Sequence, residues 1–127
     1  MWDRYNVSKL LEVFAVREMG ARTGPSYPVT INCLNPGLCH SELGREAGVA
    51  LWLMKLLLAR TTEVGSRTIL AAAAAGEESH GKYMGDSVVV NPSELVMSEE
   101  GAAVQKQLWA ELTRRLEKIR PGVTANL

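Results

Sequence analysis

The chain has 127 residues, of which 46% are hydrophobic and 22% are charged, as in an ordinary globular domain. Its 14 basic residues balance its 14 acidic residues, which excludes the net positive charge typical of proteins that bind nucleic acid or anionic membranes. The polar N-terminus and the lack of a long apolar run predict neither a signal peptide nor a membrane span, so we expect a cytoplasmic protein.

The first third of the chain predicts a helix, a loop and a strand. Apolar residues recur at helical spacing at Val7, Leu10, Leu11 and Phe14. This pattern predicts a helix from about residue 5 to residue 19, and the glycines and prolines of residues 20–28 predict a loop after it. The β-branched run at residues 29–34 has no clean alternation, which favours a strand buried on both faces.

The remainder predicts two further helices, a strand region and a final helix. The first of these helices covers about residues 47–59, with an apolar stripe at Trp52, Leu53, Leu56 and Leu57. The next starts after Thr61-Thr62-Glu63 and continues to Gly76. Short strand-like pieces occupy 82–84 and 88–90, and the last helix runs from about residue 98 to residue 121. This alternation indicates an α/β layered fold. Two strands cannot form a parallel sheet alone, so we expect that part of the fold is missing.

Tyr5 and Lys9 form the pair most suited to chemistry. They are four residues apart, so a helix presents them on one face. A free tyrosine has a pKa of about 10, and a nearby ammonium group favours the phenolate, which makes tyrosine a usable general acid or base. The spacing alone is weak, because chance produces it about one time in eight in such a composition, and plain helix surface is the alternative.

The surrounding motifs resemble those of short-chain dehydrogenases/reductases. The segment Tyr5-Asn6-Val7-Ser8-Lys9 resembles the Tyr-x-x-Ser-Lys core of that family, and Asn35-Pro36-Gly37-Leu38 resembles the Pro-Gly segment after its sixth strand. Ser41-Glu42-Leu43 falls where retinol-dehydrogenase-like members usually have Thr-Glu-Leu. His80-Gly81-Lys82-Tyr83-Met84 is similar to their Ser-Gly-Lys-Tyr-Phe stretch. The resemblance covers nearly the whole chain in order and is nearest to the retinol-dehydrogenase/WW-domain-oxidoreductase branch.

This resemblance implies a fold and a reaction. Residues 1–127 would be a partial NAD(P)-binding Rossmann-fold domain, the C-terminal portion of a doubly wound parallel sheet whose N-terminal βαβ units are missing. The reaction would be hydride transfer between a nicotinamide cofactor, NADP by a narrow preference over NAD, and a small apolar carbonyl or alcohol substrate.

The resemblance also implies the roles of individual residues. Tyr5 would donate or accept the proton, and Lys9 would lower the tyrosine pKa and bind the ribose hydroxyls. The backbone of Pro36, Gly37 and Leu38 would border the nicotinamide, and Ser41 would replace the usual threonine hydroxyl near the cofactor. In open α/β sheets ligands bind beyond the carboxyl ends of strands, which is where residues 35–38 would lie.

Several other interpretations of the same residues remain open. Pro36-Gly37 could be only a turn, and Ser41 could be only a helix cap. Tyr83 and Trp109 are expected to be packing residues, and His40 and His80 to face solvent. No second ligand pair accompanies Cys39 and His40, so no metal site is expected, and the two cysteines fit a reducing compartment.

The chain also departs from the family. The glycine-rich turn that cradles the cofactor diphosphate and the serine that polarises the carbonyl belong upstream of Tyr5, and neither occurs here. We therefore expect a fragment that is inactive alone; the alternatives are a non-catalytic remnant or an interaction module that uses helix 47–59. Val7, Leu11 and Phe14 could contribute to a homodimer through the first helix or to ordinary core packing. Trp52, Leu53 and Leu56 suggest an apolar substrate pocket.

Overall fold

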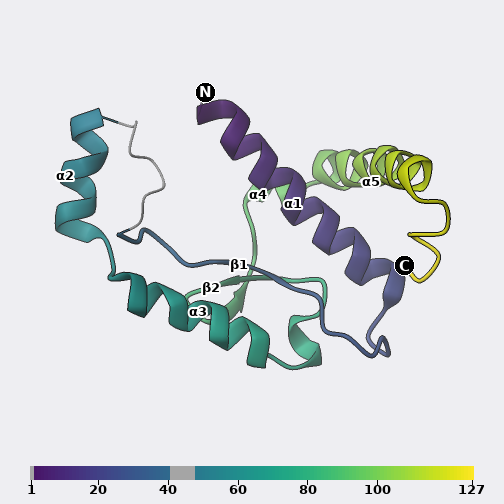
Figure 1. Cartoon of the computed structure of the whole chain (residues 1–127), viewed down its shortest axis with the longest axis horizontal. Coiled ribbons are helices and arrows are strands. Elements are labelled where there is room, and N and C mark those ends of the chain that lie inside the picture. The colour runs from purple at the N-terminus through teal and green to yellow at the C-terminus, as the bar shows by residue number, and fades with distance from the viewer. Residues whose placement is uncertain (1, 41–47) are drawn as a thin grey trace.

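The computed structural model describes residues 2–40 and 48–127, and Figure 1 shows their arrangement. The helices are α1 (Trp2–Thr23), α2 (Gly48–Leu58), α3 (Thr62–Ala74), the one-turn α4 (Glu94–Met97) and α5 (Glu99–Ile119), with a 3-10 turn η1 at Glu77–Ser79. The strands are β1 (Cys33–Asn35), β2 (Tyr83–Gly85) and β3 (Val88–Val90). The predicted α/β class is confirmed.

The three strands form one small mixed sheet in the order β1-β2-β3. β1 and β2 are parallel, with Cys33 opposite Tyr83 and Asn35 opposite Gly85. β3 returns antiparallel to β2 through Asp86 and Ser87, both of which have positive φ (51° and 68°), as a tight two-residue hairpin turn requires. The sheet is therefore mixed: β1 and β2 are parallel as expected, and β3 is antiparallel because so short a turn can join only antiparallel strands.

Helices cover both faces of the parallel pair. Just before β1, the Asn32 side-chain amide donates to the Ala72 carbonyl of α3 at 2.9 Å and to Ser79 Oγ at 3.0 Å. Side chains alternate along a strand, so Cys33 points to the opposite face, where it lines a pocket together with residues of α1. The strand pair is thus enclosed between α1 and α3.

A polar network and one aromatic ring join α1 to α5. Gln105 of α5 donates to Glu18 at 2.8 Å and accepts from Arg17 at 3.2 Å. Arg22 donates to the other Glu18 oxygen at 2.9 Å and lies over the Trp109 ring, with 5.4 Å between its Cζ and the ring centroid. Trp109 is only 6% exposed, which confirms its expected packing role.

The first helix continues past Gly20, where a loop was predicted. Gly20 lies inside the helix at a close backbone contact, since a Cβ added there would lie 2.2 Å from Gly81 Cα. The helix ends instead at Gly24, which has a positive φ of 70° and donates its N–H to the Gly20 carbonyl at 3.0 Å.

His80 is part of this junction and is half-buried, so the expectation that it faces solvent is wrong. The backbone N–H of Ile31 donates to His80 Nδ1 at 3.3 Å. Because Nδ1 accepts, the proton of the neutral ring lies on Nε2, which donates to Thr23 Oγ1 at 2.9 Å. The ring therefore ties the end of α1 to the segment that leads into β1.

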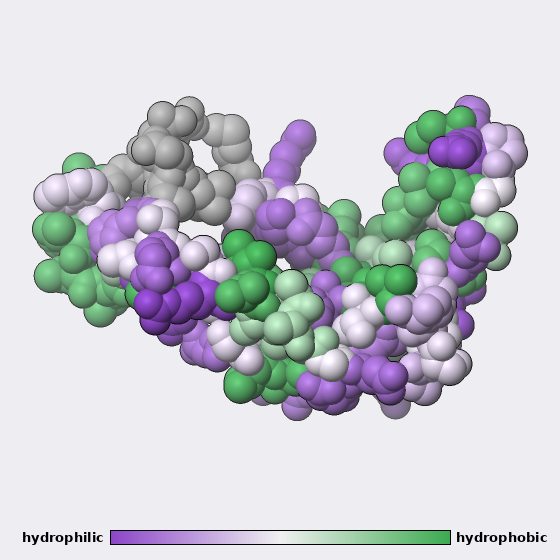
Figure 2. All heavy atoms as spheres, turned by 60° about the horizontal axis from the view of Figure 1, so that its bottom comes forward, coloured by the Kyte–Doolittle hydropathy of each residue, from purple (hydrophilic) through white to green (hydrophobic). Residues whose placement is uncertain are grey.

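Helix α2 stands away from the sheet in Figure 1, and most of its described side chains are exposed. Trp52 is 62% exposed, and Figure 2 shows apolar side chains gathered at this end of the molecule. Among the described residues, no helix combines the length and the apolar content that crossing a membrane requires.

Candidate active site

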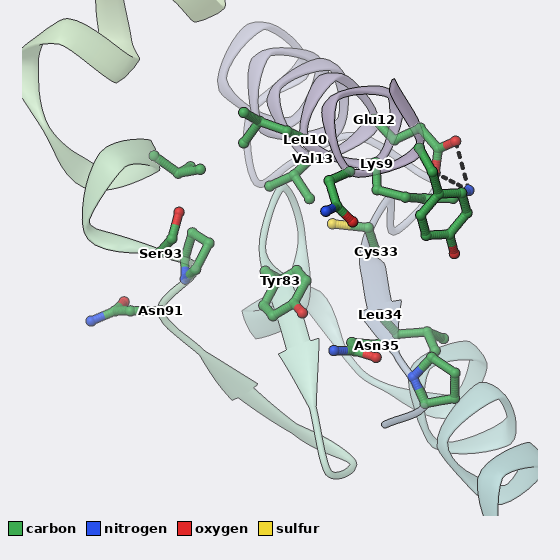
Figure 3. A pocket seen from close by; sticks show the side chains of 15 residues that line it. Lys9, Leu10, Glu12, Val13, Cys33, Leu34, Asn35, Tyr83, Asn91 and Ser93 are labelled. Atoms are coloured by element: carbon green, nitrogen blue, oxygen red, sulfur yellow. Dashed lines mark hydrogen bonds and ion pairs between the residues drawn. The ribbon is translucent and has the colours of Figure 1, made fainter. Parts of the chain in front are cut away.

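One open pocket of about 830 Å³ lies between α1 and the strands. Figure 3 shows its wall on α1, its floor on β1 and β2, and the segment that follows β3 on the far side. The polar and ionisable side chains that line it are Tyr5, Asn6, Lys9, Glu12, Cys33, Asn35, Tyr83, Asn91 and Ser93. Its size is within the range of small-molecule sites in proteins.

Tyr5 and Lys9 reach this pocket from consecutive turns of α1. Lys9 Nζ is 5.9 Å from the centroid of the Tyr5 ring, and Tyr5 is 38% exposed. Ser8 does not join them, because its hydroxyl donates to the Tyr5 carbonyl at 2.7 Å within the helix. The structure therefore presents a tyrosine and a lysine side by side at an accessible cavity.

The predicted apolar stripe of α1 divides between three environments. Phe14 is 1% exposed and belongs to the core, whereas Leu10 lines the pocket beside Lys9. Leu10 thus lies on the pocket side of the helix, because it is only about 100° around the helix from Lys9. Val7 and Leu11 are exposed at 51% and 37%.

Glu12 is the closest partner of Lys9 in the structure. Lys9 Nζ lies 2.9 Å and 3.0 Å from the two carboxylate oxygens of Glu12. This hydrogen bond raises the pKa of Lys9 above its ordinary value of 10.5; burial opposes the rise, and the negative charge of Glu12 adds to it. Both side chains are more than half exposed, so the pair contributes little to global stability. Sequence reasoning missed Glu12, although its i, i+3 spacing from Lys9 was visible.

Replacing Glu12 with glutamine is expected to lower the Lys9 pKa toward 10.5, because the charged acceptor is lost. A raised lysine pKa stabilises the fold below the ordinary pKa, and that contribution disappears as the pH rises through the folded value. An NMR pH titration of the Lys9 Cε and Nζ signals measures the change. Glu63→Gln, which removes the partner of Arg67 on α3, serves as the control. An unchanged Lys9 pKa in Glu12→Gln would show that the pair does not form in solution.

The segment after β1 completes one side of the pocket. Asn35 Oδ1 accepts the Gly37 N–H at 2.9 Å, and Gly37 adopts a positive φ of 77°, which glycine tolerates at no steric cost. Pro36 lines the pocket with Tyr5 and Lys9, whereas Gly37 and Leu38 lie just beyond its lining. Ser41, the remaining site residue expected from the sequence, is outside the described residues.

Two further side chains line the pocket floor. Tyr83 is not merely a packing residue as expected, because it lines the cavity next to Cys33, its partner in the β1–β2 register. The sequence alone could not show that Tyr83 and Cys33 share a face, because this depends on how β1 and β2 are paired. Burial raises the pKa of the Cys33 thiol, the nearby Arg17 opposes this, and Glu12 adds to it, so the thiol stays protonated at neutral pH.

The apolar residues of α2 do not shape this pocket. Trp52, Leu53 and Leu56 are 62%, 50% and 59% exposed and are absent from its lining. The suggestion that they line an apolar substrate pocket is therefore wrong for the chain as it stands. The apolar character of the pocket comes instead from Leu10, Val13, Leu34, Pro36, Pro92 and Val96.

Curated relatives cover almost the whole chain. A short chain dehydrogenase/reductase of Cryptosporiopsis sp. (strain 8999) is 53% identical over an alignment of 129 residues that covers 99% of this chain and 40% of that protein. A short-chain dehydrogenase of Penicillium roqueforti (strain FM164) is 41% identical over 97% of this chain and 35% of its own length. A short-chain dehydrogenase/reductase of Phaeosphaeria nodorum is 41% identical over 98% and 38%, respectively.

The chain thus spans about 40% or less of the length of these relatives. No protein-family model matches it. No solved structure matches it significantly. Relatives that share the name short-chain dehydrogenase or short-chain dehydrogenase/reductase thus match almost the whole chain, which supports its assignment to that family.

Proposed function

We propose that this chain is part of a short-chain dehydrogenase/reductase and carries the proton-transfer side of an NAD(P)-dependent hydride-transfer site. The observation that supports this most is the convergence of Tyr5, Lys9 and the segment after β1 on one open pocket. The substrate would be a small carbonyl compound or alcohol, in keeping with the apolar side chains around the pair.

The residues present fit a nicotinamide and its ribose. The pocket opens at the carboxyl end of β1, where ligands of open α/β sheets bind, and Lys9 offers an ammonium group to hydroxyl oxygens there. When bound, the cofactor supplies or takes the hydride. Tyr5 gives its phenolic proton to the carbonyl oxygen, or takes one from an alcohol in reverse. The Lys9 ammonium stabilises the negative charge that develops on the Tyr5 oxygen.

The same proposal covers the fold and its missing part. Residues 1–127 form part of an NAD(P)-binding Rossmann-fold domain, and a parallel strand pair with helices on both faces supports this. The diphosphate site and the carbonyl-polarising serine would come from outside these residues, so the chain alone would be inactive. NADP is preferred over NAD, the compartment is cytoplasmic, and a homodimer would use the exposed Val7 and Leu11 of α1.

A second candidate is an interaction module without catalysis. It is favoured by α2, whose Trp52, Leu57 and Leu58 are 62%, 73% and 71% exposed. A helix that is apolar on nearly all sides is normally buried against another surface. Concentration-dependent association without nucleotide binding would support this candidate.

Fluorescence titration of the chain with NADPH and NADH tests the proposal. We expect saturable binding of either nucleotide, which a Tyr5→Phe/Lys9→Ala double variant weakens about tenfold or more, because hydrogen bonds from a charged group are lost. A Tyr27→Phe/Lys106→Ala variant makes the same chemical changes outside the pocket and should bind as the parent does. A folded chain that binds neither nucleotide would contradict the proposal and favour the non-catalytic alternatives.

A further inference from the structure

Two loops meet at the carboxyl edge of the sheet. Asn35 and Gly85 are paired in the parallel register, so the segments that follow them, residues 36–38 and the hairpin turn at Asp86, leave the sheet side by side. Neither loop has a direct hydrogen bond to the other among the described interactions. A third segment, the connection between α2 and α3, supplies the link.

Arg60 in that connection contacts both loops. Its backbone N–H donates to the Leu38 carbonyl at 2.9 Å, and its carbonyl accepts from the His40 N–H at 2.9 Å. Its Nη1 lies 2.6 Å from Asp86 Oδ1 in an ion pair. One residue therefore fixes the far end of residues 36–38 through its backbone and reaches the hairpin turn through its side chain.

The guanidinium group also lies next to Gly37, on the side where a side chain would project. A Cβ added at Gly37 would lie 3.6 Å from Arg60 Cζ and from Nη1, which is ordinary van der Waals contact. Gly37, with its positive φ, therefore has the Asn35 hydrogen bond and the Arg60 guanidinium group as neighbours. A lysine could not reproduce both contacts, because its ammonium is a compact point charge without the several N–H groups and planar extent of a guanidinium.

We propose that Arg60, held by Asp86, is a positioning residue that fixes the backbone of residues 36–38 for the nicotinamide. This rests on the proposed function, in which that segment borders the nicotinamide. The Arg60 and Asp86 side chains are 40% and 70% exposed, and such exposed pairs contribute little to global stability. The effect of the pair is therefore local, on the loop that it holds.

Amide hydrogen exchange of the 127-residue chain tests this hold without any cofactor. In Arg60→Met and in Asp86→Asn, the His40 and Arg60 amides are expected to exchange about tenfold faster, because local opening of the loop becomes easier. Arg67→Met removes a comparably exposed ion pair, with Glu63 on α3, and should leave both amides unchanged. The Asp86 variant leaves the Arg60 side chain intact, so a folding defect specific to Arg60→Met does not confuse the result.

Binding of reduced nicotinamide mononucleotide tests the consequence for the site. Arg60→Met and Asp86→Asn are expected to weaken it about fivefold or more at an unchanged melting temperature, and Arg60→Lys is expected to restore it only in part. Unchanged exchange in both variants overturns the positioning role, as does unchanged affinity where the parent binds. If the parent chain does not bind the mononucleotide, the proposed function is overturned instead. The hydrogen-exchange rates of the His40 and Arg60 amides then decide by themselves whether the Arg60–Asp86 pair positions the loop.

Discussion

Replacing Gly20 with alanine is expected to destabilise the protein by about 2 to 3 kcal/mol, as overpacking at a rigid contact does. The new methyl group would lie 2.2 Å from Gly81 Cα and 2.8 Å from Gly81 N. Gly81 cannot easily move aside, since it has a positive φ of 69° and its N–H donates to the Ile31 carbonyl at 2.7 Å. Urea denaturation monitored by circular dichroism measures the change.

The sign of this result is informative, because helix propensity predicts the reverse. Within a helix, alanine is about 1 kcal/mol more favourable than glycine, so an unhindered Gly20→Ala change would raise stability. Ala21→Gly at the neighbouring exposed position is the matched control and should cost only that propensity difference. A more stable Gly20→Ala variant would show that α1 and the loop before β2 do not meet as described.

Most of the helices could be predicted because their signals are local. The hydroxyl of Thr61 caps α3 by accepting from Val64 N at 3.2 Å, and Ser98 caps α5 by accepting from Gly101 N at 3.0 Å. The continuation of α1 past Gly20 could not be predicted, because the glycine indicates a helix end and its contact with Gly81, 61 positions further along the chain, gives no local signal. The one-turn α4 is too short to produce a periodic pattern.

The residues of the site also fall into those that local sequence patterns predict and those that only the tertiary structure brings together. Tyr5 and Lys9 could be found because four-residue spacing on a helix fixes which face they share. Tyr83 reaches the same pocket only through the β1–β2 register, and Arg60 reaches the segment after β1 only through the path of the chain between α2 and α3. Neither placement produces a pattern in the local sequence, so neither could be predicted from it.

The chain spans too little of its relatives for turnover to be tested on it alone, which a graft overcomes. The chain would replace the segment that it matches in the Cryptosporiopsis sp. dehydrogenase/reductase, which is 53% identical over the aligned residues. Changing Tyr5 to phenylalanine in this graft is expected to lower kcat by about 10²- to 10⁴-fold, the usual contribution of a positioned general acid or base. The cofactor Kd should change little, because the ring and Lys9 remain.

Turnover of this graft, with and without the Tyr5 hydroxyl, tests most directly whether the pocket performs proton transfer. The rate of cofactor oxidation with a substrate of the recipient enzyme is measured for the graft, its Tyr5→Phe variant and a Tyr27→Phe control, since Tyr27 lies outside the pocket lining. We expect the graft and its Tyr27→Phe control to be equally active, and the Tyr5→Phe variant to bind the cofactor but catalyse almost no turnover. A Tyr5→Phe variant within about threefold of the parent kcat would contradict this expectation.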